Sequence, residues 1–174
     1  MIKNKSQIWI ETAIYTLIGL TIMAIILSIA TPQIEKIKEK TIIKQTITAL
    51  DELNNEIQKV EQNTGTIKIV LFKITKGKLE IKSNEDKIIY SLENTNLEFS
   101  EEGEKIKEGD LTFYTEKLGR RFNIFLELSY ENLNITFNRK EQIKTLSQGI
   151  YKIQLENVGD NPIGNKTHID FKIV

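Results

Sequence analysis

Residues 1–34 read MIKNKSQIWIETAIYTLIGLTIMAIILSIATPQI, a short basic leader followed at once by a long apolar run. No residue from Thr12 to Ile34 is charged. A helix rises 1.5 Å per residue, so this segment extends about 35 Å, enough to cross a hydrocarbon core of about 30 Å. The acid at its start, Glu11, would cost roughly 2.5 kcal/mol or more at the centre of a bilayer, so its presence requires an explanation.

The apolar run differs from a secretory signal peptide, whose core is shorter, about 7–15 residues, and ends in a small-residue cleavage site. Here the obvious candidate, Ser28-Ile29-Ala30, leads directly into further helix-like sequence. Cleavage there would leave an amphipathic helix with no evident start. We therefore expect the segment to be retained.

A second helical stretch follows, because apolar residues recur at spacings of three, four or seven up to Gln62. A proline removes one backbone hydrogen bond from a helix, so we expect a kink near Pro32 rather than a break. Gly65 can end the helix, because glycine readily adopts the left-handed conformation. The pattern predicts one helix over residues 7–62, membrane-spanning over about 8–31 and amphipathic over 33–62. Its apolar face comprises Ile43, Ile47, Leu50, Leu53, Ile57 and Val60.

From residue 66 the apolar period changes to two, which is typical of strands that bury one face. The charged segment 101–110 holds two glycines and is expected to be a solvated loop. Short strands without a second helix favour an antiparallel β-sandwich-like domain over residues 66–174, so the expected fold class is α+β. The predicted strands are 66–74, 79–82, 87–92, 111–118, 121–129, 133–137, 150–156 and 168–173.

Composition narrows the classes of function. Lys+Arg 24 against Asp+Glu 24 gives no net charge and no basic block, which disfavours binding to nucleic acid. The chain has no cysteine, and its one histidine, His168, is expected to be structural. Because no catalytic, metal-binding or phosphate-binding pattern is present, we expect neither an enzyme nor a cofactor.

Two glycosylation sequons, Asn134-Ile135-Thr136 and Asn165-Lys166-Thr167, lie in the predicted β domain. Asn134 and Asn165 are therefore candidate N-glycosylation sites, if the domain is exported in a cell that has the machinery.

The N-terminal residues carry a resemblance to a known family. The leader through Lys5 and Ser6, then Gln7-Ile8-Trp9-Ile10-Glu11 and an uninterrupted apolar helix, resembles the class III signal of type IV pilins and related archaeal pilin-like proteins. The resemblance implies that prepilin peptidase cuts after Ser6, a position where glycine is commoner in the family. Gln7 would then become the new N-terminus, and Glu11 would be the fifth residue of the mature chain. A glutamine at that terminus favours the archaeal branch.

The resemblance also implies partners and a location: a cell membrane, the pilus assembly machinery, and copies of this chain or other pilins. Residues 1–6 would form a cytoplasmic leader, as the lysines of the leader also indicate, and residues 66–174 an extracellular domain. Glu11 could then pair with the Gln7 α-amino group of a neighbouring subunit. Two alternatives stay open. One is a minor pilin, and the other is an uncleaved, single-pass membrane-anchored surface protein whose β-sandwich is a binding or adhesion domain.

Overall fold

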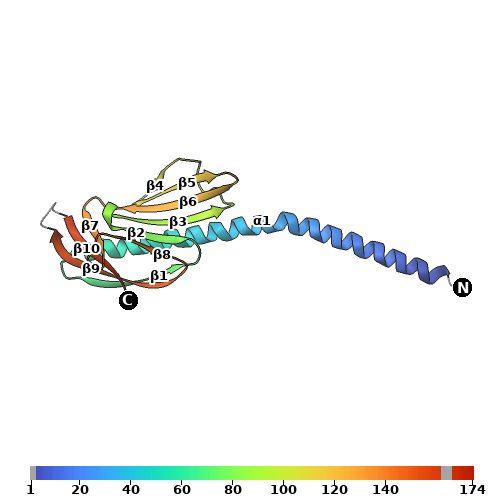
Figure 1. Cartoon of the computed structure of the whole chain (residues 1–174), viewed down its shortest axis with the longest axis horizontal. Helices are drawn as coiled ribbons and strands as arrows, with labels where there is room; N and C mark the ends of the chain where they lie inside the picture. The colour runs from blue at the N-terminus through green and yellow to red at the C-terminus, as the bar shows by residue number, and fades with distance from the viewer. Residues whose placement is uncertain (1–2, 162–165) are drawn as a thin grey trace. The chain divides into compact units, whose positions relative to one another are not determined.

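The computed structural model describes residues 3–161 and 166–174. Within them the chain forms one long helix followed by strands and a short 3-10 turn (Figure 1). The chain divides into two compact units, Met1–Lys38 and Glu39–Val174. The elements are α1 (Lys3–Glu61), β1 (Ile67–Ile74), β2 (Lys78–Lys82), η1 (Ser83–Glu85), β3 (Lys87–Thr95), β4 (Ile106–Glu108), β5 (Leu111–Leu118), β6 (Arg121–Ser129), β7 (Leu133–Phe137), β8 (Ile143–Leu146), β9 (Gly149–Asn161) and β10 (Lys166–Ile173).

The long helix predicted from the sequence is confirmed. Helix α1 has 59 residues and begins at Lys3, inside the predicted leader, rather than at residue 7. It continues through Pro32 without interruption, and the kink expected there stays a prediction. The helix ends before Gly65, whose φ of 82° is the left-handed conformation that the sequence indicated.

Two sheets make up the β part of the second unit, as expected for a sandwich-like domain. One has the order β1-β9-β10-β7 and the other β4-β5-β6-β3-β2-β8. The pairs are antiparallel with one exception, β10 beside β7, which is parallel. Strands β5, β6 and β7 have the bounds that the alternating pattern predicted.

Two short edge strands were not predicted. β4 lies inside the segment 101–110, which we expected to be a loop, and β8 lies in a segment that was assigned no strand. All three residues of β4 are exposed, and only Leu146 of β8 is buried. A strand that buries no face shows no alternation of apolar and polar residues in the sequence. β4 and β8 therefore form through backbone pairing at the edges of the sheet, which the sequence pattern does not predict.

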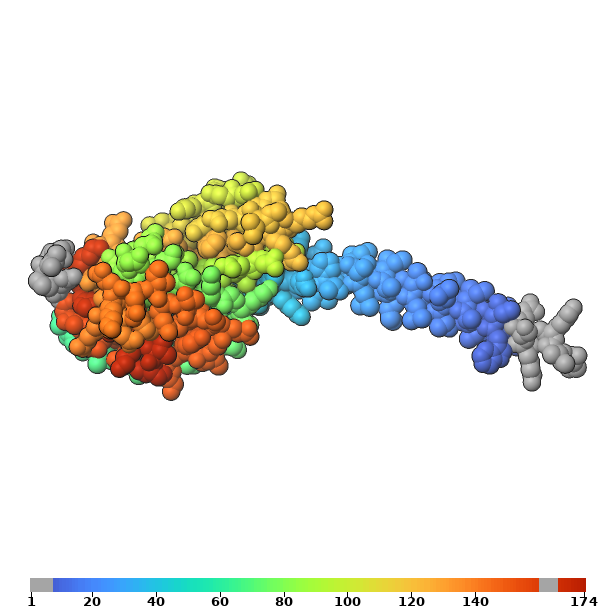
Figure 2. Space-filling model, in the orientation of Figure 1, coloured from blue at the N-terminus to red at the C-terminus, as the bar shows by residue number. Residues whose placement is uncertain are grey.

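One hydrophobic core joins both sheets to the second half of α1. Leu50, Leu53, Ile57 and Val60 are fully buried with Ile43, and the inward residues of both sheets complete the cluster. From the side shown in Figure 2, strand residues cover most of the helix beyond Glu39. Burial of each such aliphatic side chain contributes about 1.5–3 kcal/mol to the stability of the fold. The amphipathic half of the helix is therefore an integral part of the domain core.

Candidate functional site

The first half of α1 presents apolar side chains in every direction around the helix. Trp9 is 80% exposed, Tyr15 73% and Leu17 66%, and the remaining large apolar residues up to Ile34 are similarly exposed. This is the one helix in the described residues that is long and apolar enough, by length and composition, to cross a membrane. It could therefore anchor the protein in a membrane.

Hydroxyl groups along this half are hydrogen-bonded to the helix itself. Thr12 Oγ1 donates to the Ile8 carbonyl at 2.9 Å, and Thr16 Oγ1 donates to the Thr12 carbonyl at 2.8 Å. Thr21, Ser28 and Thr31 donate to carbonyls three or four residues earlier in the same way. These polar groups consequently need no water, which suits either a lipid or a bundle of apolar helices.

Glu11 is the charged residue among these apolar side chains. It is exposed, and within the part of the chain that the structure describes it has no hydrogen-bond or ion-pair partner. The backbone of Lys5, Ser6 and Gln7 belongs to α1, whereas their side chains lie outside the described atoms. In a helix, positions 7 and 11 lie one turn apart on the same face, so Glu11 lies close to the predicted cleavage point.

Glu39 is a second carboxylate on α1, and its situation is the opposite. It is only 6% exposed and accepts hydrogen bonds from Lys76 Nζ at 2.7 Å, from the Thr95 hydroxyl, and from the Asn96 backbone N–H at 3.2 Å. Burial alone would raise the pKa of the Glu39 carboxyl, but these donors and the Lys76 charge together hold it below its usual value. Glu39 thus ties α1 to the β1–β2 turn, to the end of β3 and to the residue that follows it.

Asn157 secures the other end of the helix. Its side-chain amide donates to the carbonyl oxygens of Val60 at 2.9 Å and Glu61 at 3.0 Å, two groups that have no partner within the helix. Its backbone carbonyl accepts from the Gly65 N–H at 2.8 Å. The C-terminus of α1 is therefore capped by a residue of β9 that is 2% exposed.

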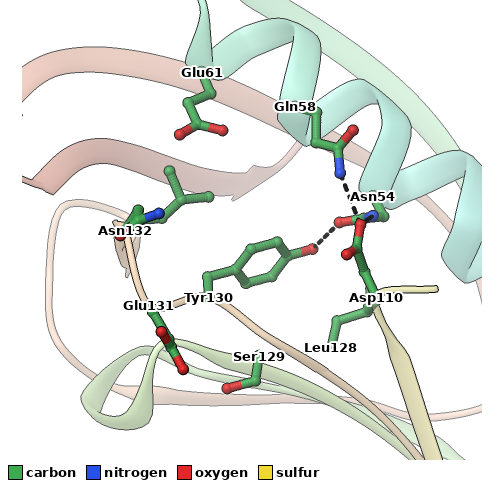
Figure 3. A pocket seen from close by; sticks show the side chains of 10 residues that line it. Asn54, Gln58, Glu61, Asp110, Leu128, Ser129, Tyr130, Glu131 and Asn132 are labelled. Atoms are coloured by element: carbon green, nitrogen blue, oxygen red, sulfur yellow. Dashed lines mark hydrogen bonds between the residues drawn. The ribbon is translucent and has the colours of Figure 1, made fainter. Parts of the chain in front are cut away.

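A pocket of about 180 Å³ lies between the helix and the end of β6 (Figure 3). The Tyr130 hydroxyl donates to Asn54 Oδ1 at 2.8 Å, and the amides of Asn54 and Gln58 both donate to Asp110 Oδ2 at 2.8 Å. Burial, followed by the charges of Asp110 and Glu61, raises the pKa of Tyr130. These polar groups satisfy one another, so the pocket is lined by a structural network between α1 and the second sheet.

His168 and the first sequon meet in the first sheet. The Thr136 hydroxyl donates to Asp170 Oδ1 at 2.7 Å and lies 2.8 Å from His168 Nε2, so the imidazole is the donor in that second bond. A catalytic triad requires the histidine between the hydroxyl and the carboxylate, whereas here the hydroxyl is in the middle. The arrangement of Thr136, His168 and Asp170 is therefore not that of a triad, and the structural role expected of His168 stays a prediction.

The glycosylation candidates stay predictions. Asn134 is half-buried in β7, and the hydroxyl of its sequon, on Thr136, is buried and already hydrogen-bonded. Asn165 lies outside the described residues. In those residues no group of three His, Asp or Glu side chains is arranged to hold a metal ion.

The sequence analysis missed Glu39, Asn157 and the Tyr130 network. Only Glu39 left a usable signal: it lies four residues before Ile43 and is therefore in phase with the buried face of the helix. A charged residue at such a position indicates a buried ion pair. The other contacts join residues up to 97 positions apart, and no local pattern predicts them.

Comparison with protein-family models, with curated proteins and with solved structures finds no match to this chain. The class is therefore defined by architecture alone. A long N-terminal helix, apolar in its first half and built into a β-rich domain in its second, is a type IV pilin-like architecture. It is compatible with a membrane-anchored, pilin-like protein.

Proposed function

We propose that this chain is a structural subunit, major or minor, of a type IV pilus-like surface filament of the archaeal branch. It carries a class III signal, is cut by prepilin peptidase between Ser6 and Gln7, and assembles through its N-terminal helix. Its leader faces the cytoplasm and its β domain faces outward. The role is structural, without catalysis and without binding to nucleic acid.

The observation that carries the proposal is the position of Glu11. It is the sole charged residue between Ile8 and Ile34, and it lies four residues after the proposed new N-terminus. An α-amino group created at Gln7 would supply a cation in an otherwise apolar environment, where a carboxylate is strongly stabilised by such a partner. Pairing between Glu11 of one subunit and Gln7 of its neighbour would fix the axial register of the filament.

The apolar helix supports the same proposal. A subunit that moves from a membrane into a filament needs one surface that is compatible with both lipid and identical helices. The exposed apolar residues and the internally bonded hydroxyls of α1 have this property. The second half of the same helix lies in the domain core, so every assembled helix would carry its own β domain.

Mass spectrometry of the protein isolated from its native membrane tests the processing step. The expected result is a mature chain that begins at Gln7. A chain that keeps an intact Met1 and has no N-terminus at Gln7 would falsify the pilin proposal and favour an uncleaved, single-pass surface protein.

A matched pair of variants tests the role of Glu11. Glu11→Gln keeps the size of the side chain and removes its charge, whereas Glu11→Asp keeps the charge. We expect Glu11→Gln to insert into the membrane normally and to lose filaments, and Glu11→Asp to keep a measurable fraction of them by electron microscopy. Normal filaments from Glu11→Gln would show that the charge does not set the register.

A further inference from the structure

The turn between β5 and β6 carries an exposed apolar residue among three cations. Leu118 is 69% exposed. Lys117, Arg120 and Arg121 are also exposed, and within the described residues none of them has a hydrogen-bond or ion-pair partner. Two of the chain's three arginines are therefore adjacent in one turn. The planar guanidinium group of arginine matches the geometry of a phosphate, so the turn has the side chains that bind a phosphate-bearing surface.

This turn lies at the end of the β domain where α1 enters it. Glu39, the first residue of the second unit, accepts a hydrogen bond from Thr95 at the end of β3. Thr95 lies opposite Phe122 of β6, so Arg121 is one residue beyond the level of this contact. β5 runs toward the same end of the domain (Figure 1).

The chain allows only a short distance between this end of the domain and a membrane. Glu39 follows Ile34, the last residue of the apolar run, by five positions of a continuous helix. Five residues extend about 8 Å in a helix and at most about 18 Å in any conformation. The polar headgroups add about 5–8 Å to each side of the hydrocarbon core. When the apolar run crosses a membrane, the end of the domain that holds the turn therefore lies next to the headgroups.

The neighbouring segments leave this end of the domain basic. Two of its carboxylates are in ion pairs. Glu39 binds Lys76 at 2.7 Å, and Glu93 binds Lys78 at 2.9 Å. The other charged residues at this level are two carboxylates and four cations: Glu98, Glu116, Lys40, Lys117, Arg120 and Arg121. Cations therefore exceed carboxylates by two.

The next group of carboxylates, in the segment 101–104, is set back from the turn. The Gly103 N–H donates to the Thr115 carbonyl at 3.0 Å, which holds this segment beside Thr115. Thr115 precedes Leu118 by three residues, or about 10 Å along a strand. That distance is about one Debye length at 0.1 M salt, so these acids are largely screened from a surface that the turn touches.

We propose that the β5–β6 turn docks on the lipid headgroups of the membrane that α1 crosses. Arg120 and Arg121 bind lipid phosphates, and Leu118 lies among the headgroups. Each basic residue close to an anionic lipid surface strengthens the attraction about fivefold. The contact needs the membrane anchor of the proposed function, but neither cleavage at Ser6 nor assembly. It holds the β domain in one orientation on the membrane before a filament forms.

Fluorescence quenching of the full chain in lipid vesicles tests the contact, because the natural chain has no cysteine and one label can be placed at will. The vesicles contain phosphatidylcholine and phosphatidylglycerol, with a spin-label quencher on some headgroups. A fluorophore on Leu118→Cys should be quenched several-fold more than one on Ile143→Cys. Ile143 is the matched control, an exposed aliphatic residue of the same sheet that lies opposite Lys82, at the end of β2 away from the turn. Equal quenching at the two positions would overturn the proposal.

Replacement of the two arginines separates a docked turn from one that is only close to the membrane. In the labelled Leu118→Cys background, Arg120→Glu with Arg121→Glu should lower the ratio of docked to undocked turns about tenfold or more. The matched variant, Arg120→Lys with Arg121→Lys, keeps both charges and should keep most of the quenching. Circular dichroism checks that both variants fold. Unchanged quenching after charge reversal would show that these cations do not dock the turn.

Flotation of the same vesicles tests the anchor separately. A chain that does not float with the vesicles has no membrane anchor, and both this contact and the filament proposal then fail. A chain that floats without quenching at position 118 refutes the docked turn alone. A docked turn in a native chain that is never cut at Ser6 refutes the filament proposal alone.

Discussion

Replacement of Glu39 by alanine should destabilise the β domain by about 2–4 kcal/mol. The substitution removes the Glu39 acceptor from the hydroxyl of the fully buried Thr95, and an unsatisfied buried donor costs about 1–3 kcal/mol. It also removes the hydrogen bond from the half-buried Asn96 N–H, which adds about 1 kcal/mol. Lys76 adds little, because its side chain is 47% exposed and its ammonium group returns to water. For a domain of this size the loss corresponds to a melting temperature lower by about 6–12 °C.

The assay is urea or thermal unfolding of the full chain in detergent, followed by the β-sheet circular dichroism signal. Lys40→Ala is the matched control, since Lys40 is the exposed neighbour of Glu39 on the same helix, and it should change stability by no more than about 0.5 kcal/mol. If Glu39→Ala were as stable as Lys40→Ala, the reasoning about the buried acceptor would be refuted.

The effect should also depend on pH, with a sign fixed by the pKa of Glu39. Its pKa is lower in the folded protein than its ordinary value near 4.5, so the carboxylate contributes its full stabilisation above that value. The contribution is lost as the pH falls through the lowered folded pKa. The stability difference between the natural chain and Glu39→Ala should therefore be constant at neutral pH and shrink in acid.

Four other substitutions probe the domain. Asn157→Ala should lower the free energy of unfolding by about 1–3 kcal/mol in urea, because two helix-end carbonyls lose their donor. Gly103→Ala should lower the free energy of unfolding by about 1 kcal/mol in the same assay, and Gly77→Ala should lower it more. Both glycines have positive φ, but only at Gly77 would a Cβ collide with the Ser91 carbonyl. Burial raises the pKa of Tyr90 to about 12. The stabilisation by its neutral hydroxyl should therefore be present below pH 10 and be lost as the pH rises through 12. Alkaline unfolding of Tyr90→Phe and of the natural chain, compared at each pH, measures this loss.

The sequence predicted those elements whose pattern is set by burial. The amphipathic half of α1 and the strands β5, β6 and β7 each bury one continuous face, so the apolar period identifies them. β4 and β8 bury almost nothing, and backbone pairing at a sheet edge leaves no mark on side-chain choice.

The parallel pairing of β7 with β10 could not be predicted for a different reason. Strand order depends on contacts between segments far apart in the chain, such as Ile135 opposite Ile169. Asp86 contributes to this arrangement, since its carboxylate accepts from the Ile135 N–H and from Lys166 Nζ, both at 2.8 Å. In the sequence Asp86 is only a turn residue, because its partners are on other strands.

Glu11 and Glu39 show how the same residue type on one helix can have two meanings. Glu11 interrupts an apolar sequence and Glu39 has a buried side chain, and both carboxylates cost free energy unless something compensates the charge. For Glu39 the compensation comes from Lys76, Thr95 and Asn96 of the same chain, so its role is complete within one molecule. For Glu11 the described residues offer no group that compensates the charge. A partner that stabilises its carboxylate in an apolar environment must therefore come from its own processed N-terminus, from another subunit, or from water at the membrane surface. The first two sources require cleavage before Gln7 or assembly, and the third requires neither, which is why the N-terminus of the native protein separates a filament subunit from a plain anchor.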